Sequence, residues 1–236
     1  MKIQGKKIVF TVAGLFLAAL LVAAAFFAFP AYKDYREEKM LYSLIRANKG
    51  AAVALKTIEE TEKTKVKDPF NVGPYITIGN NWVLIADLLA SQRSRDKAIV
   101  EYEKGERVSG QKNSVIIVNA GNAYRASGRL KEAEGKYRLA IQINPGDPTA
   151  YEKLVELYRF DLKKSPAEII PIFQEALDKL VDNTSVVLAL SEYLVSINRL
   201  ESALQYYELL AKRYPDQFNP VVSDLKTRIA VSKTVK

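Results

Sequence analysis

One spacing constrains this chain more than any other feature of its sequence. Similar patterns of apolar residues begin at Trp82, Ile117, Tyr151 and Val187, which are separated by 35, 34 and 36 residues. A period of this length is typical of stacked two-helix units, because a single helical hairpin cannot bury its apolar face without neighbours. The sequence therefore predicts an array of helical hairpins.

The clearest unit lies between Ser114 and Pro145. The tetratricopeptide repeat (TPR) has the pattern W-x2-L-G-x2-Y, then A-x3-F, then P, over 34 residues. The slots of that pattern are filled here by Ile117, Ala120, Gly121, Tyr124, Ala133, Tyr137 and Pro145. Over residues 79–217 the chain therefore resembles the TPR family. The resemblance implies an all-α solenoid of about four repeats, in which helices A and B of each unit are antiparallel and Gly121 lets their backbones approach.

Three further units fill the same slots less completely. The first has Trp82, Ile85, Ala86, Leu89, Ala98 and Tyr102, the third Tyr151, Leu154, Val155, Tyr158, Ile169, Phe173 and Ala176, and the fourth Val187, Leu190, Ser191, Leu194, Ala203, Tyr207, Leu210 and Pro215. The third unit inserts two residues within 160–164. Its helix B then begins with a capping box, Ser165 to Glu168, and Pro171 is expected to bend that helix.

Both flanks of the repeats are predicted to be helical. Residues 31–78 are expected to be a helical connector with two helices, over 31–46 and 51–66. The spacing of these helices would also allow them to be a degenerate repeat. The Pro and Gly residues of 67–78 then predict a linker or an extended segment. Residues 218–236 are expected to be a capping helix and a basic tail, with Asn219 as the N-cap and Pro220 in the first turn.

The N-terminal region predicts a membrane anchor. Residues 8–29 form an uncharged run of 22, and a helix of that length spans a hydrocarbon core of about 30 Å. The rival interpretation, a cleaved signal peptide, has a shorter apolar region followed by small residues. Here Phe26, Phe27, Phe29 and Pro30 stand in their place. We therefore expect a transmembrane anchor over 8–30, preceded by a short basic flank, 1–7.

The orientation of this anchor depends on its flanks. Basic residues are present on both sides of the span, so their number alone does not determine which end of the anchor is cytoplasmic. The short leading flank is rich in lysine, whereas the distal flank is diluted by Asp34, Glu37 and Glu38. We expect a single-pass membrane protein with a cytoplasmic N-terminus and the repeats on the extracytoplasmic side. Gly14 and Ala18 are small residues four positions apart, a spacing at which two anchor helices could pack together. A homo-oligomer is therefore one possible state of the protein.

Composition excludes several classes of function. The chain has no cysteine and no histidine, which rules out disulfides, Cys/His zinc sites and histidine-based catalysis. It contains no glycine-rich phosphate loop, and the repeats occupy nearly all of the chain beyond the anchor. We therefore expect no enzyme, no cofactor and no metal. The net charge is +8, but basic and acidic residues are interleaved, so we expect no nucleic acid as partner.

A partner-binding groove follows from the resemblance. In the family, helix A residues that are not used for packing line the concave side of the solenoid. Here these residues are Val83, Asp87, Ala90, Val118, Asn122, Arg125, Glu152, Lys153, Glu156, Arg159, Leu188, Glu192 and Val195. Relatives that grip the carboxylate tail of heat-shock chaperones use Lys and Asn there. Only Asn122 and Lys153 match, which argues against that ligand.

The mixture of apolar and charged groove residues favours a protein partner, either a peptide segment or the surface of another subunit. We expect a non-catalytic, membrane-anchored TPR scaffold that docks into a membrane-associated multisubunit assembly. The alternative is a transient client-binding factor for assembly or secretion quality control. The two differ in stoichiometry rather than in sequence.

Overall fold

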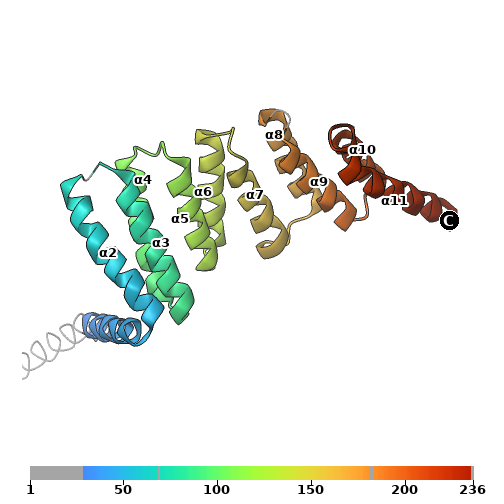
Figure 1. Cartoon of the computed structure of the whole chain (residues 1–236). Helices are drawn as coiled ribbons and strands as arrows, with labels where there is room; N and C mark the ends of the chain where they lie inside the picture. Colours follow the sequence, from blue (N-terminus) through green and yellow to red (C-terminus); the bar gives the residue numbers. More distant parts are fainter. Residues whose placement is uncertain (1–28, 69, 181–182, 235–236) are drawn as a thin grey trace, which may run out of the picture.

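The computed structural model describes residues 29–68, 70–180 and 183–234, and within these ranges the chain is helical with no strand (Figure 1). The prediction of an all-α fold is confirmed. Residues 29–47 are helical, and ten α-helices and one π-helical turn follow in the described part. They are α2 (Lys49–Lys67), α3 (Val72–Leu89), α4 (Gln92–Val108), α5 (Ser114–Ala126), α6 (Leu130–Ile143), α7 (Pro148–Glu156), η1 (Leu157–Asp161), α8 (Pro166–Lys179), α9 (Thr184–Ser196), α10 (Leu200–Arg213) and α11 (Pro215–Thr234).

Four hairpins form the solenoid: α3 with α4, α5 with α6, α7 and η1 with α8, and α9 with α10. We call them units 1 to 4. Each hairpin turns through one residue in the left-handed conformation, which reverses the chain within a short loop. These residues are Ala90, Gly128, Lys163 and Asn198, with φ of 49°, 73°, 51° and 58°. The first helix of every unit starts at a polar N-cap, such as Asn113, whose side chain accepts the N–H of Ile116.

Unit 2 shows how the helices of a hairpin approach each other. A Cβ atom added at Gly121 of α5 would lie 2.6 Å from Cε1 of Tyr137 on α6. The aromatic ring therefore occupies the space that any larger residue would need, and Tyr137 is fully buried. The close helix crossing predicted at Gly121 is confirmed.

Unit 1 has a different register from the one predicted. Its helices are 18 and 17 residues long, against 13 and 14 in unit 2. Tyr102 precedes Tyr137 by 35 residues in the sequence, which is close to one repeat. The glycine on which Tyr102 packs is Gly79, however, and Gly79 precedes its counterpart Gly121 by 42 residues. The helix A slots therefore belong to Tyr75, Ile78, Gly79 and Trp82, and the assignment that began at Trp82 is wrong. The extra length forms an additional turn at the loop end of both helices.

Unit 3 absorbs its two inserted residues in η1. The N–H of Leu162 donates to the carbonyl of Leu157 at 2.9 Å, a bond across five residues that widens the end of α7. Helix α8 then begins with the predicted capping box, since the carboxylate of Glu168 accepts the N–H of Ser165 at 3.0 Å and its hydroxyl at 2.9 Å.

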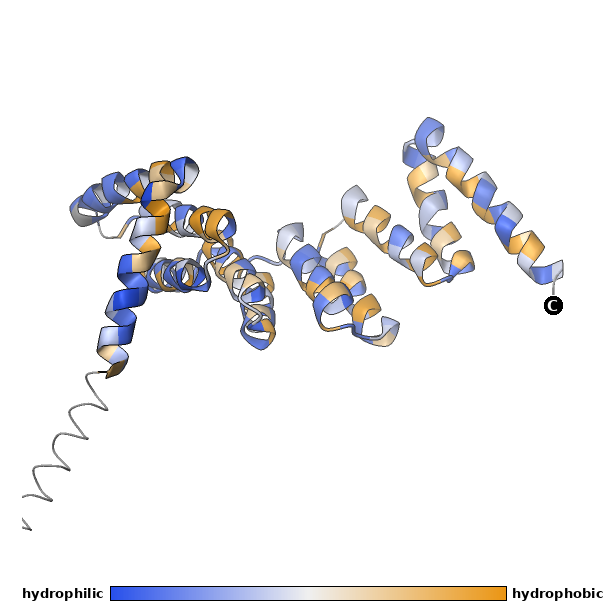
Figure 2. Ribbon diagram, turned by 90° about the horizontal axis from the view of Figure 1, so that it is seen from below, coloured by the Kyte–Doolittle hydropathy of each residue, from blue (hydrophilic) through white to orange (hydrophobic). Residues whose placement is uncertain are grey.

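The N-terminal helix is attached to unit 1. Leu41 and Ile45 are buried, and the guanidinium of Arg93, in the additional turn of α4, binds the carboxylates of Asp34, Glu37 and Glu38. Figure 1 shows residues 29–47 lying across the end of α2, at the level where α4 begins. In Figure 2 this helix is hydrophilic over its middle and becomes hydrophobic where it meets the hairpins. The additional turn of unit 1 therefore supports this helix.

Two predicted boundaries are wrong. The linker expected over 67–78 is a break of only a few residues, because Asn71 caps α3 and Gly73 and Pro74 lie in its first turn, where a missing N–H costs no helical bond. Asn219 is not an N-cap, because α11 already begins at Pro215 and contains Pro220. The helix expected after the repeats is present, and its residues Val222, Leu225 and Ile229 are buried.

The predicted membrane span, 8–30, lies outside the described residues except for its last two. Among residues 29–68, 70–180 and 183–234, no helix combines the length and the hydropathy needed to cross a membrane.

Candidate functional site

The helix A side of units 1 and 2 contains a hollow of about 300 Å³ between α3 and α5. It brings together Val83, Asp87 and Asn122, which the sequence predicted, and Asn80, which it did not. The lining is completed by Arg95, Tyr102, Asn119, Ala123 and Ala126. Most of these side chains are polar, and Asn80, Asp87 and Asn122 are exposed. The hollow therefore offers hydrogen-bonding groups to solvent.

The same tyrosine–asparagine bond occurs in both units. The hydroxyl of Tyr102 donates to Oδ1 of Asn80 at 2.6 Å, and that of Tyr137 donates to Oδ1 of Asn122 at 2.8 Å. Burial raises the pKa of Tyr137 to about 12 and also raises that of Tyr102, so both phenols keep the proton that they donate.

Each bond leaves an amide group free. With Oδ1 of Asn80 and Asn122 occupied, neither Nδ2 group has an acceptor in the described part of the chain. Both amides line the same hollow and can donate to a carbonyl oxygen.

Sequence analysis missed Asn80 because the register of unit 1 was wrong. The sequence offers one local resemblance, since Asn80 follows Gly79 as Asn122 follows Gly121, but this pair of residues does not by itself fix the register.

The charges at the middle of the predicted groove are paired with each other. Arg125 of α5 binds Glu156 of α7 through Nη1 at 2.8 Å and Asp161 of η1 through Nη2, also at 2.8 Å. Lys153 binds the other oxygen of Glu156 at 2.9 Å. Burial would raise the pKa of Glu156, but the hydrogen bonds from Lys153 and Arg125 lower it below its ordinary value. These side chains link units 2 and 3, so their charges are already paired within the solenoid.

The remaining predicted residues fall into four environments. Val118 is only 5% exposed and belongs to the core, so it does not line an open groove. Arg159 lies over the ring of Tyr193 at 4.8 Å and thereby joins units 3 and 4. Leu188 is half-buried against the core. Of these remaining residues, Glu152 and Glu192 are exposed. The structure thus brings Val83, Asp87 and Asn122 together, and places the others along the array.

Comparison with solved structures identifies the fold. The crystal structure of MamA superposes with a TM-score of 0.52 at 15% sequence identity and covers 72% of this chain and 96% of that one. The thermophilic TPR protein TTC0263 from Thermus thermophilus gives a TM-score of 0.51 at 18% identity and covers 66% and 80%. The chain has the fold of a TPR solenoid.

A third structure, MamA 41-end from Desulfovibrio magneticus RS-1, agrees with these two. Its TM-score is 0.51 at 13% identity, with 76% of this chain and 96% of that one covered. No family model matches the sequence, and no curated protein does either. The TPR solenoid of this chain is therefore recognised through its fold.

Proposed function

We propose that this chain is a non-catalytic TPR scaffold that holds a peptide segment of a protein partner against Asn80 and Asn122. The observation that carries the proposal is the repeated tyrosine–asparagine bond, which orients two free amide groups into one hollow. The TPR fold supports it, because stacked hairpins present an extended surface suited to protein partners.

The two amides would recognise the backbone of the partner. An extended peptide exposes carbonyl oxygens along its length, and each NH2 group donates to one of them without selecting a side chain. The buried phenols hold the amides in place, so little conformational entropy is lost on binding. Asp87 and Arg95 at the same hollow, whose side chains lie 3.6 Å apart, would add selectivity for polar residues of the segment.

The double substitution Asn80→Asp with Asn122→Asp tests this site. Aspartate keeps the oxygen that accepts from each tyrosine, but it replaces the NH2 donor by a charged acceptor that repels carbonyl oxygens. We expect at least a tenfold loss of the partner that co-purifies with the full chain, because two donors are lost in a desolvated contact. The melting temperature should change by less than about 3 °C, which corresponds to a small change in stability.

A matched control places two negative charges elsewhere. Lys131→Glu on the exposed side of α6 together with Lys63→Glu on α2 changes the net charge further without touching the hollow. This control should retain the partner. If it releases the partner while the asparagine variant keeps it, the helix A hollow is not the binding site.

We also propose that residues 8–30 anchor the solenoid in a membrane, with the N-terminus in the cytoplasm. The uncharged run of 22 residues supports an anchor. The attachment of Asp34, Glu37 and Glu38 to Arg93 supports a scaffold role, because it joins the segment after this run to unit 1. The anchor would then fix the direction in which the hollow with Asn80 and Asn122 faces relative to the membrane.

Cysteine labelling tests the orientation, since the chain has no cysteine of its own. We expect a membrane-impermeant thiol reagent applied to intact cells to label Lys236→Cys and to spare Gly5→Cys. Both positions should react after the membrane is permeabilised. Labelling of Gly5→Cys alone in intact cells would place the repeats in the cytoplasm.

The stoichiometry of the purified complex distinguishes the two kinds of binding protein. A permanent subunit of an assembly should recover its partner in a fixed molar ratio from detergent-solubilised membranes. A transient client-binding factor should recover several partners in low and variable amounts.

A further inference from the structure

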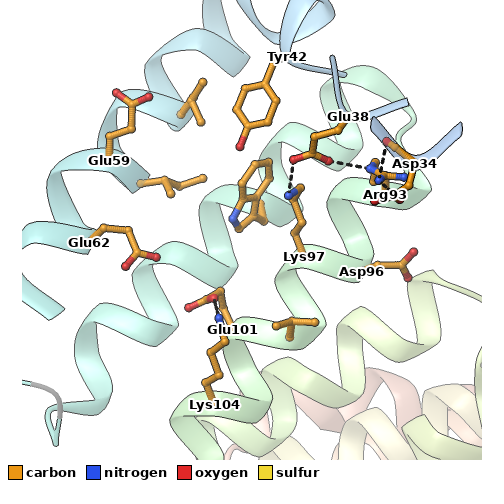
Figure 3. Close-up of a pocket in the computed structure, with 14 residues that line it drawn as sticks. Asp34, Glu38, Tyr42, Glu59, Glu62, Arg93, Asp96, Lys97, Glu101 and Lys104 are labelled. Carbon is orange, nitrogen blue, oxygen red and sulfur yellow. Dashed lines mark hydrogen bonds and ion pairs between the residues drawn. The ribbon is translucent and has the colours of Figure 1, made fainter. Parts of the chain in front are cut away.

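A second hollow lies on the other side of α3, between α2, α4 and the N-terminal helix. It has a volume of about 910 Å³, and Figure 3 shows its lining. Trp82 of α3 belongs to this lining; it is only 6% exposed, and the Nζ atom of Lys97 lies 5.1 Å from the centre of its ring. The hollow is separate from the asparagine site, since no residue lines both.

Part of the apolar lining of this hollow is exposed to solvent. Besides the buried Trp82 and Ile58, the apolar lining consists of Tyr42 of the N-terminal helix, Leu55 of α2 and Val100 of α4. Val100 is 46% exposed, and Tyr42 and Leu55 are half-buried. A partner that covers these side chains would gain the free energy of burying apolar surface.

The shape of the hollow fits a helix. Leu55, Ile58, Glu59 and Glu62 follow the spacing i, i+3, i+4, i+7 along α2, and Arg93, Asp96, Lys97, Val100, Glu101 and Lys104 do so along α4. Two helix faces therefore form its long walls. An amphipathic helix placed between them would pack as one further helix of the array.

The walls carry more negative than positive charge. The lining has six carboxylates, on Asp34, Glu38, Glu59, Glu62, Asp96 and Glu101, and three basic groups. All three basic groups are already paired: Arg93 with Asp34 and Glu38, Lys97 with Glu38, and Lys104 with Glu101.

Two of the carboxylates have no cationic partner in the described part of the chain. Glu59 stands on the α2 wall and Asp96 on the α4 wall, and both are exposed or partly exposed to solvent. Among the described residues, the one side-chain donor to the carboxylate of Asp96 is the amide of Gln92, at 3.1 Å. The hollow is therefore a negative region on a chain whose net charge is +8, and its charge complements a cationic partner.

We propose that this hollow is a docking site for a cationic amphipathic helix of a protein partner, whose apolar face covers Val100, Tyr42 and Leu55 beside Trp82 and whose lysine or arginine side chains reach Glu59 and Asp96. The site does not depend on the asparagine site. It gives the solenoid a second binding face, so one chain can hold two partners.

The single tryptophan of the chain makes the test specific. Trp82 is the only tryptophan in the sequence, so its fluorescence reports occupancy of this hollow. The full chain in neutral detergent is titrated with a 15-residue amphipathic helix of Leu, Ala and Lys that contains no tryptophan. We expect a saturable shift of the Trp82 emission that weakens as salt is added, because salt screens the charges at the exposed walls. A peptide with Glu in place of every Lys should give no saturable shift.

Charge reversal of the free carboxylates completes the test. Glu59→Lys with Asp96→Lys should raise the Kd of the Lys peptide about tenfold, since like charges then face each other. Glu152→Lys with Glu192→Lys makes the same change of net charge on the helix A side and should change the Kd less than twofold. Circular dichroism checks that each variant is folded.

Three results would overturn the proposal. They are equal shifts with the Lys and Glu peptides, an unchanged Kd in the Glu59→Lys, Asp96→Lys variant, and an equal loss of affinity in the Glu152→Lys, Glu192→Lys control. Binding of the peptide to detergent does not imitate these results. It leaves the Trp82 emission unchanged, and it lowers the concentration of free peptide equally for all variants.

Discussion

Leucine in place of Gly79 or Gly121 is expected to lower the free energy of unfolding by roughly 3 kcal/mol or more. At both positions an aromatic ring of helix B, from Tyr102 or Tyr137, occupies the space where a side chain would begin. Both rings are buried, so neither can move aside without opening its unit. Urea denaturation of the purified variants, followed by circular dichroism, measures the loss.

Gly135 provides the matched control, because it lies on α6 and a Cβ atom there would meet nothing within 4 Å. Gly135→Leu should leave the stability unchanged or raise it by up to about 1 kcal/mol, since leucine has the higher helix propensity. If all three variants denature at the same urea concentration, the helices of units 1 and 2 are farther apart than this structure has them.

The second large effect concerns the contact between α4 and α6. Lys136→Glu is expected to cost about 3–5 kcal/mol, because Lys136 neutralises Glu106, whose side chain is only 4% exposed. The Nζ atom of Lys136 lies 2.8 and 2.6 Å from the two carboxylate oxygens of Glu106. The substitution would place two carboxylates together in a nearly dry contact between units 1 and 2. Thermal denaturation of the variant measures the cost.

Lys131→Glu makes the same change of charge on the exposed side of α6 and should cost less than about 0.5 kcal/mol. The double variant Glu106→Leu with Lys136→Met should recover most of the stability, since an apolar pair of similar volume replaces the buried ion pair. A Lys136→Glu protein as stable as the Lys131→Glu protein would show that Glu106 is not held in this contact.

Much of the fold could be predicted from local sequence. Gly121, Tyr137 and the capping box at Ser165 lie in segments where residue type and short-range spacing determine the conformation, and all three predictions are confirmed. The helix after the repeats, α11, was also predicted although its start was not, because the existence of a helix is easier to predict than its exact end.

The candidate site was less predictable, because it depends on pairs that are distant in sequence. Arg125 and Glu156 are both polar residues on A helices, and each alone suggests a solvated groove. Their ion pair across units 2 and 3 makes them part of the solenoid instead. Glu106 and Lys136 pair in the same way on the helix B side, 30 residues apart.

By itself, the sequence determined that this chain forms stacked helical hairpins, because a period near 34 residues with the TPR slots filled is typical of two-helix units that bury their apolar faces only against neighbours. The tertiary structure alone decided the register of unit 1. A shift of seven residues is almost two helical turns, so it leaves the same face of α3 apolar in either register. Only the packing of Tyr102 on Gly79 distinguishes the two, and that packing places Asn80 beside Asn122.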